Sequence, residues 1–209
     1  MVGQGVLREC LLDPDVESVL SVSRQSVHQQ NPKFREIIHA DLLNLSAIEP
    51  QLKGYDACFY CLGISSVGMN EQDYTRITYD FTVSVGSTLV KQNPNMVFVF
   101  VSGAGTAQRN SMWSRVKGKA EDALMKMPFK AAYMFRPGFI EPLHGITSKT
   151  KSYRVVYAIV RPLFPLLLKY PKYVTTTERI GRAMLRVVKQ GFPKQILESE
   201  DINSAALLQ

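Results

Sequence analysis

The chain has 209 residues, of which 45% are hydrophobic and 21% charged, and its formal net charge is +7 at pH 7. This length and composition predict one globular domain with a large core and exclude a mainly disordered chain. The positive charge favours an anionic partner, such as a phosphorylated cofactor or acidic lipid headgroups. Because the basic residues are scattered along the chain, we do not expect nucleic acid as a partner.

The cysteines and histidines show no pattern of a metal site. Three cysteines without framework spacing indicate a reducing compartment, and the amino terminus shows no cleavable signal, so we expect a cytoplasmic location. Cys58 and Cys61 form a C-x-x-C within a predicted strand, where residues three apart point to opposite faces. We therefore expect both to be buried apolar residues, with no metal or redox role.

The chain opens with a predicted helix over residues 1–12, which Asp13-Pro14 ends. In a doubly wound nucleotide-binding fold, the last glycine of a G-x-x-G-x-x-G turn lies in the first turn of such a helix, and Gly3 fits that place. On this interpretation the first strand and the first two glycines of the motif are missing. The alternative is that Gly3 and Gly5 only loosen a free chain end.

A predicted strand over residues 17–23 ends in Ser23-Arg24. An acidic residue here would bind an adenosine ribose, whereas a hydroxyl group followed by an arginine suits a 2′-phosphate. The sequence therefore favours NADP over NAD. The alternative is a solvated arginine that merely follows a strand.

Two more predicted strands deliver candidate residues at their carboxyl ends. The strand over residues 34–40 leads into Asp41-Leu42, and Asp41 could also cap a helix predicted over residues 44–53. The strand over residues 56–62 ends in Leu62-Gly63, and a glycine there permits close approach of a cofactor. A helix is predicted over residues 73–92, ended by Asn93-Pro94.

The most informative stretch begins with the apolar run of residues 97–101, which is typical of a strand buried on both faces. Ser102 follows it, and the next predicted helix carries Trp113 and Lys117, which share one face because they lie one turn apart. A further strand over residues 130–136 ends in Arg136-Pro137-Gly138.

The regular alternation of strands and helices predicts a single α/β domain over residues 1–209. We expect a doubly wound, mostly parallel Rossmann-type sheet with helices on both faces and a small C-terminal lobe. Residues 138–175 would form the substrate lobe. Ligands of such sheets bind at the carboxyl ends of the strands, where the candidate residues fall.

The last part of the chain is less patterned. Residues 149–172 combine basic side chains with an apolar run too short to span a membrane, which fits a substrate lobe or a segment lying on a membrane surface. Thr175-x-x-Glu178 has the spacing of a capping box and would start a last amphipathic helix that Gly191 ends. We expect the residues after Glu198 to be frayed.

Taken together, these motifs resemble the atypical short-chain dehydrogenase/reductases of the epimerase/dehydratase-like group, with most similarity to the Tat-interacting-protein-like oxidoreductases. The matching segments are residues 116–121 (VKGKAE), residues 135–138 (FRPG), Ser102 and Gly3. The resemblance implies an NAD(P) cofactor whose adenine lies beside Asp41, whose ribose Lys117 holds, and whose nicotinamide end meets the backbone near Pro137. Ser102 would hydrogen-bond the oxygen of a small-molecule substrate.

The sequence departs from this family at one position, where Trp113 stands in place of the tyrosine that exchanges a proton with the substrate. An indole N–H is a donor that does not titrate near neutral pH, so Trp113 cannot replace that acid. Trp113 could form a flat wall of the site or belong to the core, and a water, Ser102 or Tyr133 could relay the proton. Two functions follow: an NADP-dependent oxidoreductase or epimerase-like enzyme with an altered proton relay, or a non-catalytic NAD(P)-binding sensor or scaffold, which could be docked to a membrane. The substrate and the oligomeric state are left open.

Overall fold

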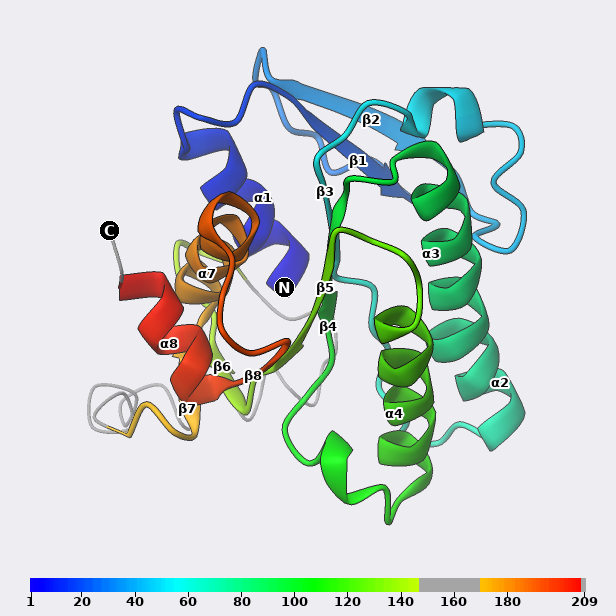
Figure 1. The fold of residues 1–209 in the computed structure, drawn as a ribbon, viewed down its shortest axis with the longest axis vertical. Helices are drawn as coiled ribbons and strands as arrows, with labels where there is room; N and C mark the ends of the chain where they lie inside the picture. Colours follow the sequence, from blue (N-terminus) through cyan, green and yellow to red (C-terminus); the bar gives the residue numbers. More distant parts are fainter. Residues whose placement is uncertain (147–169, 208–209) are drawn as a thin grey trace.

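The structure is a computed structural model that describes residues 1–146 and 170–207 (Figure 1). Its strands are β1 (Val19–Ser23), β2 (Phe34–Ile38), β3 (Ala57–Tyr60), β4 (Val97–Val101), β5 (Ala131–Arg136), β6 (Phe139–Glu141), β7 (Val174–Thr176) and β8 (Ile196–Glu198). Its helices are α1 (Val2–Leu12), α2 (Glu71–Thr75), α3 (Phe81–Gln92), α4 (Met112–Met125), α7 (Thr177–Gln190) and α8 (Ser199–Leu207), with short helical segments η1 (Glu49–Leu52), η2 (Arg76–Asp80) and η3 (Thr106–Gln108).

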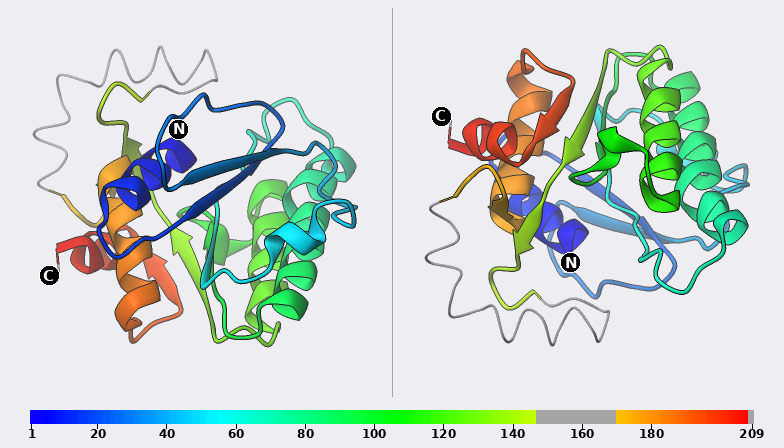
Figure 2. Two further views of the ribbon diagram at one scale, coloured as in Figure 1. Left: turned by 90° about the horizontal axis from the view of Figure 1, so that it is seen from above. Right: turned by 90° about the horizontal axis from the view of Figure 1, so that it is seen from below.

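A parallel sheet of order β3-β4-β5-β8 forms the centre of the molecule. In its register Val99 of β4 lies between Phe59 of β3 and Tyr133 of β5. Helices α1, α7 and α8 cover one side of the strands, and α3 and α4 cover the other, as both views of Figure 2 show. The expected α/β architecture with helices on both faces is confirmed. Because the strands are parallel, their carboxyl ends share one edge of the sheet.

Strand β4 joins the two halves of the core, because all five of its residues are buried. Its valines pack with α1, α7 and α8, whereas Phe98 and Phe100 pack with α3 and α4. Burying a side chain of this size contributes about 1.5–3 kcal/mol. The alternation of a strand therefore divides one continuous apolar run between two helical layers.

The strands are less continuous than a single doubly wound sheet. Among the described residues β1 pairs with β2, and β6 pairs with β7, each as a separate parallel pair. Side chains of β1 nevertheless enter the same two core layers as those of β3, Val19 on the side of α1 and Val22 on the side of α3. The β1–β2 pair therefore continues the central layer through side-chain packing.

Helices α1 and α7 cross at very short range through two glycines. A β-carbon on Gly5 would lie 2.6 Å from Cβ of Thr177, and one on Gly181 would lie 2.6 Å from Cγ of Glu9. No real β-carbon tolerates such contacts, so these glycines are what lets the two helices approach. Gly5 is therefore a packing residue within a formed helix, and the alternative of a loosened chain end is wrong.

Several expected elements differ in the structure. The helix predicted over residues 44–53 is only the 3₁₀ turn η1, which has Pro50 in its first turn. The helix predicted over residues 73–92 is present, but it begins earlier, at Glu71, and contains the π-helical turn η2. Asn70 caps its start by accepting a hydrogen bond from the backbone N–H of Asp73 at 2.8 Å.

The C-terminal part also differs from expectation. The cap of α7 is Thr176 and not Thr175, because Thr175 belongs to β7 and its hydroxyl donates to Oδ1 of Asn203 at 2.9 Å. Residues 199–207 are not frayed: they form α8, whose Ile202 is fully buried. Periodicity over so short a segment could not reveal this packing, because the partners of α8 lie on α7 and β7.

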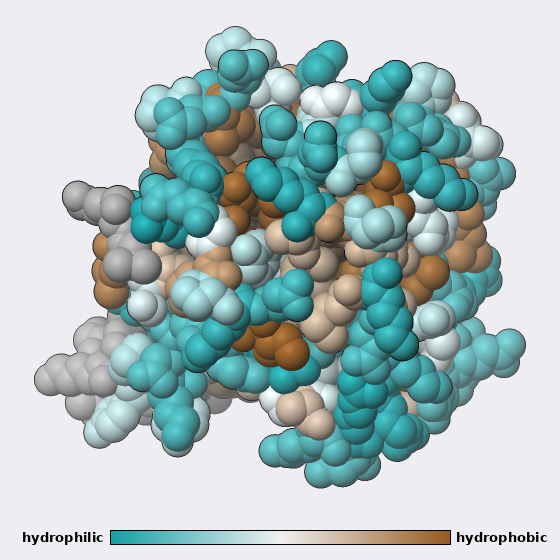
Figure 3. Space-filling model, in the orientation of Figure 1, coloured by the Kyte–Doolittle hydropathy of each residue, from teal (hydrophilic) through white to brown (hydrophobic). Residues whose placement is uncertain are grey.

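Most of the surface face in Figure 3 is hydrophilic, and apolar side chains appear there only as small separate patches. No helix among the described residues is long and apolar enough to cross a membrane. The proposed membrane-surface segment, residues 149–172, lies almost entirely in the range 147–169, outside the described residues. Membrane contact through this segment stays a prediction.

Candidate functional site

Ser102 lies at the carboxyl edge of the sheet, on the side of α4. Its backbone N–H donates to the carbonyl of Phe135 at 2.7 Å, which continues the pairing of β4 with β5 by one residue. Its hydroxyl lies 3.1 Å from Oγ1 of Thr106, which in turn donates to the carbonyl of Gly103 at 2.7 Å. A hydroxyl offers one donor and two acceptor positions. Because Thr106 uses its proton on Gly103, Ser102 donates to Thr106, and the two acceptor positions of the Ser102 oxygen stay open to a ligand.

Helix α4 presents two expected residues to this edge, and its start is fixed by a capping box that our sequence interpretation missed. The Ser111 side chain accepts from the backbone N–H of Ser114 at 3.2 Å, and the Ser114 hydroxyl accepts from the N–H of Ser111 at 3.0 Å. Such caps typically contribute about 1 kcal/mol. The hydroxyl of Ser114 is therefore committed to the helix end and does not substitute for the missing tyrosine.

Lys117 is buried directly behind Ser102. Its ammonium donates to the carbonyl oxygens of Val101 at 3.0 Å and Ser102 at 3.3 Å, and lies 5.3 Å from the ring centroid of Phe100. Burial lowers the pKa of Lys117 to about 8, while the negative charge of Glu121 acts in the opposite direction. An ammonium has three donors, so one remains for a ligand.

Trp113 is half-buried and packs against the turn that follows Ser102. A β-carbon on Gly103 would lie 2.9 Å from Cζ2 of the indole, and one on Gly105 would lie 3.9 Å from Cζ3. The structure therefore brings Ser102, Trp113 and Lys117 together, as expected from their spacing. It also makes Trp113 a wall of the turn.

Tyr133, one of the three groups that could relay the proton, does not lie where that role requires. Its hydroxyl accepts from the backbone N–H of Phe192 at 3.1 Å, just beyond the end of α7. Tyr133 belongs to the core layer of α1 and α7, on the opposite side of the sheet from Lys117. Successive residues of β5 point to opposite faces of the sheet, and Tyr133 occupies a position that faces away from Lys117.

The nucleotide side of the candidate site is built around the start of α1. A β-carbon on Gly3 would lie 3.3 Å from Cβ of Cys61, which follows β3. Gly3 thus lets the first turn of α1 sit close to the carboxyl end of β3, which is the packing role of the last glycine in a nucleotide-binding turn. The N-cap residue Met1 makes no side-chain capping hydrogen bond. Helix N-termini of this kind attract phosphate groups.

The expected phosphate reader is exposed beside β1. The hydroxyl of Ser23 donates to the carbonyl of Gln25 at 2.6 Å, which leaves its oxygen able to accept but uses its proton. Arg24 is exposed and makes no hydrogen bond or ion pair with any described residue. Its guanidinium is therefore available to an anion.

The candidate residues that follow β2 and β3 differ in their surroundings. The Asp41 carboxylate is exposed and accepts from the N–H of Leu43 at 3.0 Å, and Leu42 packs into the core layer of α3. Leu62 packs into that layer too, whereas a β-carbon on Gly63 would meet nothing within 4 Å. Internal packing does not explain the glycine at position 63, and the space beside it is open to a ligand.

Internal contacts account for Pro137 and Gly138, which the resemblance places at the nicotinamide end of a cofactor. The carbonyl of buried Pro137 accepts from the N–H of Ala104 at 3.0 Å. The N–H of Gly138 donates to Oγ of Ser199 at 2.8 Å, and a β-carbon there would lie 2.5 Å from the carbonyl oxygen of Tyr173. The contact between β6 and the segment before β7 therefore requires this glycine, with or without a cofactor.

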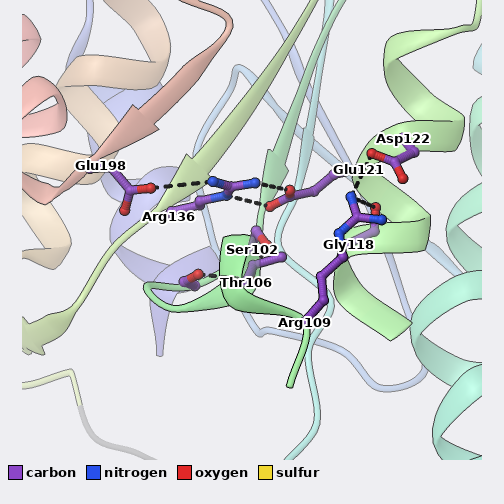
Figure 4. A network of polar contacts seen from close by, with 9 residues as sticks. Ser102, Thr106, Arg109, Gly118, Glu121, Asp122, Arg136 and Glu198 are labelled. Atoms are coloured by element: carbon purple, nitrogen blue, oxygen red, sulfur yellow. Dashed lines mark hydrogen bonds and ion pairs between the residues drawn. The ribbon is translucent and has the colours of Figure 1, made fainter. Parts of the chain in front are cut away.

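A buried ion pair beneath the site was not recognised from the sequence as a functional element (Figure 4). Glu121 on α4 is fully buried and both of its oxygens contact the guanidinium of Arg136, at 3.0 and 2.5 Å. Arg136 also reaches Glu198 at 3.4 Å. The signal available in the sequence was the position of Glu121, one helical turn after Lys117 on the same face.

The cysteines behave as apolar residues: Cys10 is buried, and Cys58 and Cys61 are partly buried. Cys58 packs into the layer of α3 and Cys61 into that of α1, so the two thiols face opposite sides of the sheet, as expected. Burial raises the pKa of Cys61 to about 12, so it stays a thiol at neutral pH. Among residues 1–146 and 170–207, no three His, Cys, Asp or Glu side chains are grouped so that they could hold a metal ion.

A surface cavity of about 320 Å³ lies beside the Asp41-Leu42 segment. It is lined by Leu43 and by residues of α2 and η2, namely Glu71, Gln72, Thr75, Arg76 and Asp80. π-helical turns such as η2 are frequent at functional sites. The cavity thus borders the segment beside which the resemblance expects the adenine.

This parallel sheet with helices on both faces has the fold of the solved dehydratase, short-chain dehydrogenase/reductase and epimerase structures to which it is similar. The Bordetella bronchiseptica enzyme WbmG, solved in complex with NAD, superposes with a TM-score of 0.67 over 95% of this chain and 68% of its own, at 10% sequence identity. ADP-L-glycero-D-manno-heptose-6-epimerase of Helicobacter pylori gives 0.67 over 95% and 73%, at 11% identity. These identities show the fold alone.

Among curated proteins, the chain is similar to the mitochondrial protein fmp52-2 of Aspergillus terreus, with 25% identity over 66% of this chain and 62% of the relative. It is 22% identical to the mitochondrial protein FMP52 of Meyerozyma guilliermondii over 96% of this chain and 88% of the relative. Protein HTATIP2 of Rattus norvegicus is 23% identical over 66% of this chain, and the match spans 58% of the rat protein. No family model matches the chain. The expected resemblance to atypical short-chain dehydrogenase/reductases is confirmed.

Proposed function

We propose that this protein is an NADP-dependent oxidoreductase or epimerase-like enzyme that acts on a carbonyl or hydroxyl group of a small molecule. The observation that carries the proposal is that the buried Lys117 ammonium donates to the backbone carbonyl of Ser102 at the carboxyl edge of β4, beside the residue whose hydroxyl is the candidate substrate contact. Two groups that can hold a substrate oxygen and a ribose hydroxyl lie side by side, at the edge where open α/β sheets bind ligands.

The residues around this pair fit a nucleotide cofactor. The N-terminal end of α1 would face the pyrophosphate, the open space beside Gly63 would admit the cofactor, and Arg24 would hold a 2′-phosphate. When bound, the cofactor would supply or accept the hydride. Lys117 would bind the ribose through its remaining N–H, and Ser102 would orient the substrate oxygen.

The altered proton relay follows from Trp113. Its indole closes the turn after Ser102 and offers no titratable group. A positioned general acid contributes about 10²–10⁴-fold to a rate, so a slow reaction is expected if only Ser102 or a water transfers the proton.

The lack of a titratable group on Trp113 favours a second candidate, a protein that binds NADP without catalysis and acts as a sensor or scaffold. In that case Trp113 is simply a wall for the nicotinamide, and the absence of an acid is of no consequence. The two candidates agree on the cofactor and differ only in turnover.

Preference for NADP rests on Arg24, and a thermal-shift titration with NADPH and NADH tests it. A ligand at ~100 times its dissociation constant stabilises the folded form by ~2.7 kcal/mol. We expect stabilisation by NADPH, weaker stabilisation by NADH, and loss of the difference in Arg24→Gln. Arg35→Gln, an exposed arginine on the neighbouring strand β2, is the matched control. No stabilisation of the chain by either nucleotide would contradict the proposal.

The location of the protein remains a prediction of the sequence. The two FMP52 relatives carry the word mitochondrial in their names. Our expectation of a cytoplasmic protein in a reducing compartment rests on the cysteines, which are free in the described part of the chain.

A further inference from the structure

The buried carboxylate of Glu121 has a second neighbour besides Arg136. Glu121 follows Lys117 by one turn of α4, so both side chains lie on the face of the helix that packs on the sheet. Both carboxylate oxygens are held by Arg136, and Figure 4 shows this pair between β5 and α4. The carboxylate is thereby fixed in position one helical turn from Lys117, on the same face of α4.

An ion pair at this depth needs an explanation beyond stability. Removing two charges from water costs several kcal/mol per ion, and well-packed apolar side chains often serve a core as well or better. Glu121 has no exposed surface and Arg136 is 7% exposed, so solvent screens the pair very little. Glu198, at the far end of the network, is half exposed and contacts Arg136 at a longer distance of 3.4 Å.

The charges around Lys117 come from several elements. Strand β4 contributes carbonyl oxygens and the Phe100 ring but no charge, β5 contributes Arg136, and β8 contributes Glu198. Helix α4 contributes Glu121 and, farther out, Asp122, which is paired with Arg109 at 2.8 Å. The charged residues of α2 and η2 on the other side of α4 are Glu71, which Arg115 holds, together with Asp73, Arg76 and Asp80.

Of these groups, Glu121 is the fully buried anion. Burial lowers the pKa of Lys117, and Glu121 opposes that effect. Arg136 in turn neutralises part of the Glu121 charge while holding the carboxylate in place. The three residues form a buried series of cation, anion and cation that runs from the site to the end of β5.

We propose that Glu121, held by Arg136, is a positioning residue that keeps the ammonium of Lys117 charged and directed at the carboxyl edge of β4. This inference rests on the proposed role of Lys117 in holding the cofactor ribose. It predicts opposite effects of the two partners: loss of Glu121 makes the charged amine of Lys117 less stable, whereas loss of Arg136 makes it more stable.

The direct test is an NMR titration of the ligand-free protein labelled with [ε-¹³C]lysine, with the Lys117 signal assigned by its loss in Lys117→Met. Glu121→Gln should lower the pKa of Lys117 by about one unit or more, because an opposite charge has been removed at short range. Arg136→Gln should raise it, and the double variant should lie between the two. Asp122→Asn, an exposed acid on the next position of α4, should change nothing.

The same variants are then titrated with NADPH as a function of pH. In Glu121→Gln the affinity at pH 7.5 should fall by about threefold, which is the loss of charged amine for a one-unit shift, and should recover at lower pH. If Glu121→Gln does not fold, the upward shift in Arg136→Gln carries the test. A Lys117 signal that is unmoved, or that moves the same way in both single variants, overturns the positioning role. Shifts as expected without any binding of NADPH overturn the proposed function and leave the positioning role intact.

Discussion

The indole of Trp113 and the backbone of Gly103 fit against each other so closely that a β-carbon on Gly103 would lie 2.9 Å from Cζ2 of the ring. The family tyrosine would occupy the start of the same helix, facing the same turn. The position is therefore shaped for an aromatic ring, and what it lacks is a titratable hydroxyl at the edge of that ring.

Trp113→Tyr supplies this hydroxyl. We expect the variant to reduce simple carbonyl substrates with NADPH at least ~10²-fold faster than the natural protein, because a positioned acid contributes that much. The measurement is NADPH oxidation over a panel of aldehydes and ketones. Trp113→Phe is the matched control, since it has the ring without the hydroxyl. Equal rates in the Tyr and Phe variants would favour the non-catalytic sensor.

Lys117→Met should make the protein more stable and less able to bind NADPH. Below about pH 8 Lys117 is charged in both the folded and unfolded states, so folding carries the full cost of burying the charge. Between that pH and the unfolded pKa of ~10.4 the cost disappears, because the folded state loses its proton first. Replacement by Met should add on the order of 1–3 kcal/mol of stability at pH 7 and almost nothing near pH 10.5.

The check is urea unfolding of both proteins at the two pH values. Comparing the variant with the natural protein cancels the cysteines and tyrosines that titrate in the same range. A stability gain that is equal at both pH values would mean that Lys117 is not the group responsible.

Alanine at position 138 should lower the stability of the fold, whereas alanine at position 63 should affect only NADPH binding. A β-carbon on Gly138 meets the Tyr173 carbonyl at 2.5 Å, so Gly138→Ala should cost about 1–3 kcal/mol of stability. Gly63 has open space around it, so Gly63→Ala should leave the melting temperature unchanged and weaken NADPH binding. Thermal unfolding with and without NADPH measures both. Unchanged NADPH affinity in Gly63→Ala would remove Gly63 from the cofactor site.

Helix α8 should contribute to the stability of the whole domain. Ile202 is fully buried, and Ile202→Ala should cost about 2–5 kcal/mol, because it leaves a cavity between α8 and α7. Leu207 is 70% exposed on the same helix, and Leu207→Ala should change stability by less than ~0.5 kcal/mol. Chemical unfolding compares the two, and equal small effects would indicate that α8 is not part of the cooperative fold.

The sequence predicted those features that depend on residues close together in the chain, and it missed those that depend on distant partners. The strand over residues 97–101 follows from its continuous apolar run, and the shared face of Trp113 and Lys117 follows from the helical repeat of 3.6 residues, so both were predictable. The 3₁₀ turn η1 and the packed helix α8 were not, because short segments carry too few repeats and depend on partners elsewhere in the chain. Thr176 replaced Thr175 as the cap because β7 runs to Thr176 and α7 begins directly after it.

The sequence by itself determined the alternation of strands and helices and the meeting of Ser102 with Lys117, since both depend on local periodicity and on the common direction of parallel strands. Only the tertiary structure decided which residues support that meeting. Arg136 pairs with Glu121 of α4 and with Glu198, which lies 62 residues further along the chain. Gly138 packs against the backbone of Tyr173. Such contacts join segments that are distant in sequence, and their partners become definite only when burial forces each charge and each backbone group to be satisfied.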